Sequence, residues 1–234
     1  MLDLSKVTLF AIDNTSRIEG TIKSLYTSMG FAKFGSVKLV TSEEYQNLYS
    51  SELISDGIIC EKMIFPVTNI DEYNYYILYE LHKHIETDFV LLTQDHAFII
   101  NPESWMDEFF EYDYIGAPWP FSENSYITPF GENIRCGNGG FSLRSKKLLE
   151  VPKNVHVPFK VYEQPDFYKM FGAKNTNEDG NICVHNRHIF IDNGCKFAPV
   201  EVAAKFSYES SVPENYGIIP FGFHCILPPN IELS

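Results

Sequence analysis

The sequence predicts an α/β fold whose central, mainly parallel sheet is flanked by helices. Short apolar runs alternate with amphipathic segments through the first 100 residues, which is the pattern of strands linked by helices. Polar residues follow these runs where the strands would end. The second half is rich in proline, glycine and asparagine, which favours loops and short strands.

Four apolar runs are the expected strands, and they cover residues 7–13, 36–41, 57–65 and 88–93. Pro66 would stop the third strand because proline lacks the N–H that a sheet requires. Strands that alternate with helices pair in parallel, so this order predicts a doubly wound sheet. Ligands of such sheets bind beyond the carboxyl ends of the strands.

The expected helices cover residues 17–29, 42–50, 71–85 and 145–150. In the first of them, Ile18, Ile22 and Leu25 share one face, as a helix packed on a sheet requires. His82 and His84 are expected on a solvated helix face.

Composition excludes several classes of protein. A chain of 234 residues with 44% hydrophobic and 15% aromatic residues can bury a sizeable core and is not disordered. A net charge of −13 without a basic run excludes nucleic acid as the expected partner and disfavours an anionic membrane surface. No apolar run approaches the roughly 20 residues of a membrane span, so association with a membrane would depend on a partner.

The five cysteines are odd in number and irregular in spacing. With no apolar leader before the first strand, they predict reduced thiols in a cytoplasmic protein.

Two segments about forty residues apart hold the most informative residues. The first runs from Gly137 to Ser145 and has three glycines in four positions, which lets the backbone approach a neighbour closely. The second is Asn177-Glu178-Asp179-Gly180, whose adjacent carboxylates can supply a base. A glycine-rich hairpin with positive φ and a surface turn are the structural alternatives.

Four motifs occur in order, at residues 113–119, 137–144, 177–179 and 220–224. This series resembles a family of small glycosyltransferase-like domains, similar in logic to the Fringe and β-galactosyltransferase groups of GT-A enzymes. The resemblance spans Thr8 to His224 and implies a GT-A-like fold, a small mixed sheet on the acceptor side, a nucleotide-sugar donor, Mn²⁺ or Mg²⁺, and a glycan acceptor. It also implies one domain over residues 1–234, with a nucleotide-binding half (about 1–100) and an acceptor-binding half (about 101–234).

The resemblance places the metal at Asp95 and His224. Asp95 matches the last acid of the family's Asp-X-Asp motif, whereas Thr93 replaces the first acid. Mn²⁺ accepts both oxygen and imidazole ligands. A turn-capping role for Asp95 and a half-buried position for His224 in an aromatic cluster remain alternatives.

The resemblance also assigns the chemistry. Asp179 would be the base of an inverting transfer of sugar from a uridine diphosphate donor, while Glu178 would hold the acceptor or exchange roles with Asp179. Asn138, Gly139 and Gly140 would lie against donor and acceptor. Arg144 is expected to contact a neighbouring carboxylate.

The nucleotide would lie against residues that follow the first and fourth strands: Asp13, Asn14, Thr15, Thr93 and Gln94. Asp13 to Thr15 could instead cap the first helix. Tyr114 and Trp119 could form a sugar-stacking wall, although large aromatic residues are more often core.

Rival interpretations remain open at this point. Four residues of types that bind zinc occur close together, Cys183, His185, His188 and Cys195, in a spacing that fits no zinc module. A sugar-phosphate nucleotidyltransferase shares the alternating architecture, but residues 13–17 lack its basic glycine-rich loop. The third alternative is a non-catalytic carbohydrate-binding or scaffold module.

Overall fold

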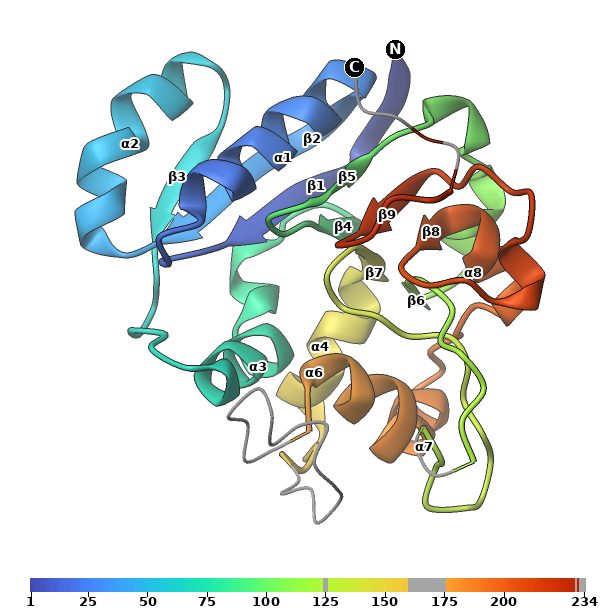
Figure 1. Cartoon of the computed structure of the whole chain (residues 1–234). Coiled ribbons are helices and arrows are strands. Elements are labelled where there is room, and N and C mark those ends of the chain that lie inside the picture. Colours follow the sequence, from blue (N-terminus) through green and yellow to red (C-terminus); the bar gives the residue numbers. More distant parts are fainter. Residues whose placement is uncertain (124–125, 160–175, 230, 232–234) are drawn as a thin grey trace.

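The computed structural model describes residues 1–123, 126–159, 176–229 and 231. Within them, a central six-stranded sheet has the order β3-β2-β1-β4-β7-β6 (Figure 1). Its strands are β1 (Leu2–Ile12), β2 (Ala32–Thr41), β3 (Ile59–Lys62), β4 (Phe89–Leu92), β6 (Tyr114–Ile115) and β7 (Ser142–Ser145). A smaller sheet has the order β5-β9-β8, from β5 (Ala97–Ile99), β8 (Ser207–Tyr208) and β9 (Gly222–His224).

The central sheet is mainly parallel, as expected. Strands β1, β2, β3 and β4 pair in parallel, and β7 is antiparallel to both β4 and β6. The small sheet is mixed, because β9 runs antiparallel to β5 and parallel to β8. The central sheet therefore takes strands from both halves of the chain.

The α-helices are α1 (Ile18–Phe31), α2 (Glu43–Ser55), α3 (Ile70–Tyr79), α4 (Lys146–Asn154), α6 (Glu178–Gly180), α7 (Arg187–Asp192) and α8 (Val200–Phe206). Short 3₁₀ segments are η1 (Leu81–His84), η2 (Pro102–Ser104), η3 (Asp107–Glu111) and η5 (Pro213–Asn215), and η4 (Asn181–His185) is a π-helix. Side-chain caps begin three of the helices: the oxygens of Ser42, Asn69 and Ser145 accept from the N–H groups of Tyr45, Glu72 and Leu148.

Successive side chains along each strand point to opposite faces of the sheet, and this divides the core into two layers. Leu9 and Leu91 face α1, α2 and α8, whereas Phe10 and Leu92 face α3, α4 and α7. Both faces of the sheet are covered, so each strand is apolar on both sides, as in α/β proteins. The predicted strands and helices are confirmed, and the differences lie at their ends.

One side-chain prediction, for His84, is wrong, and the alternatives left open for Tyr114 and Trp119 are decided in favour of core. His84 is buried rather than solvated, because η1 turns its ring toward Glu61, with Nδ1 2.5 Å from Oε2. Tyr114 is fully buried under the sheet, and Trp119 stacks on Tyr126 with ring centroids 4.2 Å apart. Neither aromatic side chain forms an open sugar-stacking wall, because both are packed as core.

The topology brings distant segments to one end of the sheet. The order of strands across the sheet reverses between the neighbours β1 and β4, and because these two strands are parallel their carboxyl ends meet at this end. Because β7 is antiparallel to β4, with Ser142 opposite Leu92, the glycine run that precedes β7 arrives at the same end. Pairing of Ala97 with His224 adds β9. Within the described part of the chain, no helix has the length and apolarity needed to cross a membrane.

Candidate functional site

A group of polar side chains meets at the carboxyl end of β4, and we call it the carboxyl-end cluster. It consists of Gln94, Asn138, Asp179, Glu209 and His224, which come from five separate segments. Hydrogen bonds link Gln94 and Glu209 directly to His224, and Asn138 Nδ2, which donates to Glu209 Oε1 at 2.6 Å, lies 3.1 Å from His224 Nδ1.

Asp179 presents a carboxylate held by backbone donors. Gly139 N–H donates to Oδ2 at 3.0 Å, and Gly180 N–H donates to Oδ1 at 2.7 Å. Burial raises the pKa of Asp179 to about 7, with a further rise from the charges of Glu178 and Glu209, while Gly180 N–H and Arg144 oppose the change. The residue as a whole is half-buried. A carboxylate that titrates near neutral pH is suited to accept a proton during a reaction.

Glu178 differs sharply from its neighbour. Its carboxylate is 3% exposed and pairs with Arg144 through two contacts, Nη2 to Oε1 at 2.9 Å and Nη1 to Oε2 at 2.8 Å. Its own backbone N–H donates to the Asn74 side chain on α3 at 3.1 Å. The expected contact of Arg144 with a carboxylate is confirmed. Glu178 is thus enclosed, and Asp179 is the carboxylate that remains accessible.

His224 lies between two hydrogen-bond acceptors. Nδ1 is 3.0 Å from Glu209 Oε1, and Nε2 is 3.2 Å from Gln94 Oε1. The Gln94 amide nitrogen donates to Tyr73 Oη at 2.6 Å, which turns the amide oxygen toward the imidazole. With Nδ1 donating to Glu209 and Nε2 donating to Gln94, the ring carries both protons and is a cation. Burial lowers the pKa of His224, but hydrogen bonds with Cys225 and Glu209 outweigh it and raise the pKa to about 10.

The glycine run allows close packing rather than unusual backbone angles. Asn138 has the positive φ (60°), while Gly137, Gly139 and Gly140 are not among the positive-φ residues. A Cβ on Gly139 would stand 1.8 Å from Glu178 Oε1, and one on Gly140 would stand 2.2 Å from His224 Nε2. The alternative of a hairpin with left-handed glycines is therefore excluded, and the expected close approach of the backbone to its neighbours explains the run.

A family model described as "Protein of unknown function (DUF5672)" matches residues 59–224. The chain belongs to the DUF5672 family. The matched range contains the whole carboxyl-end cluster and leaves residues 13–15 outside.

Solved structures share the fold of this DUF5672 protein. The galactosyltransferase LgtC, in complex with donor and acceptor sugar analogues, aligns with a TM-score of 0.52 at 14% identity over 93% of this chain and 86% of that chain. An active-site mutant of LgtC gives 0.52 at 13% identity over 95% and 88%. At such identities the likeness establishes a GT-A-like fold alone. Among curated proteins, none matches the sequence.

Asp95 and His224, the expected metal ligands, are each engaged with other groups of the DUF5672 protein. The Asp95 carboxylate lies against Gly20 at the start of α1, where a Cβ would stand 2.1 Å from Oδ1, and it is 4.0 Å from Arg17 Nε. With both nitrogens donating, the His224 ring would have to lose a proton before it could bind a metal. In the described ranges, no group of three or more His, Cys, Asp and Glu side chains could hold a metal ion. The residues expected as ligands therefore do not fit a divalent ion as arranged.

Residues near the expected nucleotide site are engaged within the protein. Asp13 accepts from Thr15 N–H at 2.7 Å and from the Thr21 hydroxyl at 2.6 Å, so it stabilises the turn before α1. Asn14 Nδ2 donates to Val67 O at 2.5 Å. Thr93 is 1% exposed and its hydroxyl donates to Ala97 O. Thr15 and Asn14 remain at the surface by the β1 carboxyl end, whereas Thr93 faces the interior.

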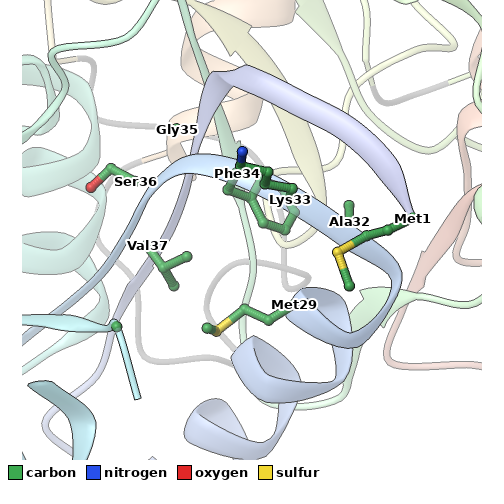
Figure 2. A pocket seen from close by; sticks show the side chains of 9 residues that line it. Met1, Met29, Ala32, Lys33, Phe34, Gly35, Ser36 and Val37 are labelled. Atoms are coloured by element: carbon green, nitrogen blue, oxygen red, sulfur yellow. The ribbon is translucent and has the colours of Figure 1, made fainter. Parts of the chain in front are cut away.

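Figure 2 shows a cavity that belongs to the other end of the sheet. It is lined by Met1, Met29, Gly57 and residues 32–37, at the amino ends of β1 and β2. The carboxyl-end cluster lies beyond the opposite ends of these parallel strands, so the cavity is not part of the candidate site.

Sequence reasoning missed Glu209 and Tyr73. Glu209 follows β8 and accepts from Asn138 Nδ2 at 2.6 Å, and Tyr73 lies on α3 and orients Gln94. Neither belongs to a motif, and tertiary contact alone joins them to the site.

Proposed function

We propose that this DUF5672 protein transfers a sugar from a nucleotide-diphosphate donor, with uridine diphosphate as the expected carrier, to a hydroxyl of a glycan acceptor. The proposal includes inversion at the anomeric carbon. The observation that supports it is the Asp179 carboxylate, accessible, held by two backbone N–H groups and titrating near neutral pH at the carboxyl end of a GT-A-like sheet.

In this mechanism, the acceptor oxygen attacks the anomeric carbon as its proton passes to Asp179. The bond between that carbon and the diphosphate oxygen breaks, and the diphosphate leaves with added negative charge. The His224 cation, fixed by Glu209 and Gln94, would face that charge and stabilise it. No step is assigned to a metal, because the residues present do not fit one. Asn14 and Thr15 would contact the nucleotide.

The decisive experiment measures transfer and slow hydrolysis of UDP-sugars by wild type and by Asp179→Asn. A lost general base should lower turnover by about 10²–10⁴-fold, while the thermal shift caused by UDP persists. Asp192→Asn is the matched control, because Asp192 is an exposed carboxylate at the end of α7. Turnover that survives Asp179→Asn would refute the role of Asp179.

The same assay separates the two rival functions. A sugar-phosphate nucleotidyltransferase would release pyrophosphate from a nucleoside triphosphate and a sugar phosphate, and would not consume a nucleotide sugar by hydrolysis. A binding module would give a thermal shift with sugar or nucleotide and no turnover. Uridine, guanosine and thymidine diphosphates compared side by side would identify the donor class.

A further inference from the structure

Arg144 is the largest fully buried side chain among the described residues, and it lies on β7 under the candidate site. Its Nε donates to Ser142 Oγ at 3.0 Å, and Nη2 donates to Tyr114 Oη at 3.3 Å in addition to its contact with Glu178. The guanidinium carbon is 4.8 Å from the centre of the Tyr114 ring. Because Arg144 has no exposed surface, it cannot directly contact a sugar donor or a glycan acceptor.

A buried ion pair of this kind is by itself weak evidence for a role in stability. Removing two charges from water costs so much that an apolar pair of similar volume is often as stable. The position of the Arg144–Glu178 pair suggests that it orients the segments on either side of Asp179. Glu178 directly precedes Asp179, and Tyr114 Oη donates to Asn138 O at 3.1 Å, just before Gly139. Arg144 therefore connects the two segments whose N–H groups hold Asp179.

The Arg144–Glu178 pair also gives the adjacent carboxylates of Glu178 and Asp179 different surroundings. Glu178 has a full counter-ion and is enclosed, while Asp179 has only N–H donors and partial exposure. Two neighbouring acids with different surroundings can take different roles. The other charged or titratable groups that influence Asp179 or are influenced by it are Arg144, Glu178, Glu209, Tyr73, Tyr114 and Cys183.

We infer that Arg144 is a positioning residue: it fixes Glu178 as a buried counter-ion, so that Asp179 alone of the two carboxylates takes the acceptor proton. This inference rests on the proposed function for its chemical meaning. Its structural content is that the Arg144–Glu178 pair sets the orientation and the titration of Asp179. The sequence motifs around residues 139–144 and 177–180 then act together to position one carboxylate, that of Asp179.

The test is a carboxyl ¹³C NMR titration of the protein labelled at aspartate, with the Asp179 signal assigned by its loss in Asp179→Asn. Wild type should titrate near pH 7. Glu178→Gln removes a negative neighbour and should lower the midpoint by one pH unit or more. Arg144→Met removes the opposing positive charge and should raise it. If Arg144→Met does not fold, the neutral pair Arg144→Met with Glu178→Gln keeps the measurement possible, and its midpoint should also lie below that of wild type.

A second arginine–glutamate pair provides the matched control. Arg135 contacts Glu214 at 2.5 and 2.8 Å, outside the carboxyl-end cluster, so Glu214→Gln should leave the Asp179 midpoint unchanged. In the transfer assay, Arg144→Lys should lower kcat at least tenfold with little change in KM for the donor. The acid limb of kcat/KM should follow the NMR midpoint in Glu178→Gln.

A midpoint of Asp179 unmoved by Glu178→Gln would overturn the inference, as would full kcat in a folded Arg144→Lys protein. Loss of activity in Glu178→Gln without loss in Asp179→Asn would reverse the two roles and overturn it too. If wild type neither transfers nor hydrolyses any nucleotide sugar, the proposed function fails. The NMR titration still decides whether the pair controls Asp179.

Discussion

The imidazole of His224 lies directly over the backbone of Gly140, so closely that a Cβ on Gly140 would stand 2.2–2.6 Å from three atoms of the ring. The ring is held from its other sides by Glu209 and Gln94. A side chain at position 140 therefore cannot be added without moving His224 out of the carboxyl-end cluster.

We expect Gly140→Ala to weaken UDP binding by tenfold or more, since displacement of His224 removes a cation from the proposed diphosphate site. Isothermal titration calorimetry measures this effect. Gly30→Ala is the control, because no heavy atom lies within 4 Å of its added Cβ. On helix α1 the control should gain up to about 1 kcal/mol of stability. Equal binding by both variants would contradict the proposed place of His224.

Asp179 should make stability depend on pH. Its pKa rises from 3.8 to about 7 on folding, so the folded state holds the proton more tightly and ionisation destabilises the protein as pH rises from about 4 to 7. Between pH 5 and 8, wild type should lose about 1–3 kcal/mol more unfolding free energy than Asp179→Asn, allowing for solvent screening. Urea unfolding at the two pH values gives the comparison. Parallel pH profiles for both proteins would show that Asp179 is not perturbed.

Nucleotide binding should not need a divalent ion. Both nitrogens of His224 face acceptors, and Asp95 lies against Gly20, so both expected ligands are engaged within the protein. We expect the thermal shift produced by UDP to be the same in EDTA and in Mn²⁺. A shift that depends on Mn²⁺ and disappears in Asp95→Ala would instead establish Asp95 as a ligand.

Cysteine alkylation should label one residue. Cys225 is exposed, whereas Cys60, Cys136, Cys183 and Cys195 are buried. Burial also raises the pKa of Cys136 to about 11 and of Cys195 to about 12, which keeps these thiols protonated and unreactive.

Native protein treated with iodoacetamide should therefore carry one adduct, at Cys225, and Cys225→Ser should carry none. Because Cys225 Sγ is 3.2 Å from His224 Nε2, bound UDP should slow the labelling. Peptide mass spectrometry follows both effects. Labelling at the same rate with saturating UDP would place the nucleotide elsewhere.

Local pattern predicted the central sheet well. The runs at residues 36–41 and 88–93 became β2 and β4, because alternating apolar side chains must be buried on both faces of the sheet. The glycine run and the Glu178-Asp179 pair were also found from sequence, since both depend on residue type at short spacing. The prediction for His84 failed because its burial depends on Glu61, which lies on another element.

By itself, then, the sequence determined the alternating α/β order and the acidic and aromatic composition. It also determined the two segments that carry the Glu178-Asp179 carboxylates and the glycine run. Only the tertiary structure decided that Glu178 is enclosed by Arg144 while Asp179 stays accessible, and that His224 lies between Glu209 and Gln94 as a cation. The reason is physical. Charge state and accessibility depend on which groups surround a side chain, and those groups come from strands and loops far apart along the chain.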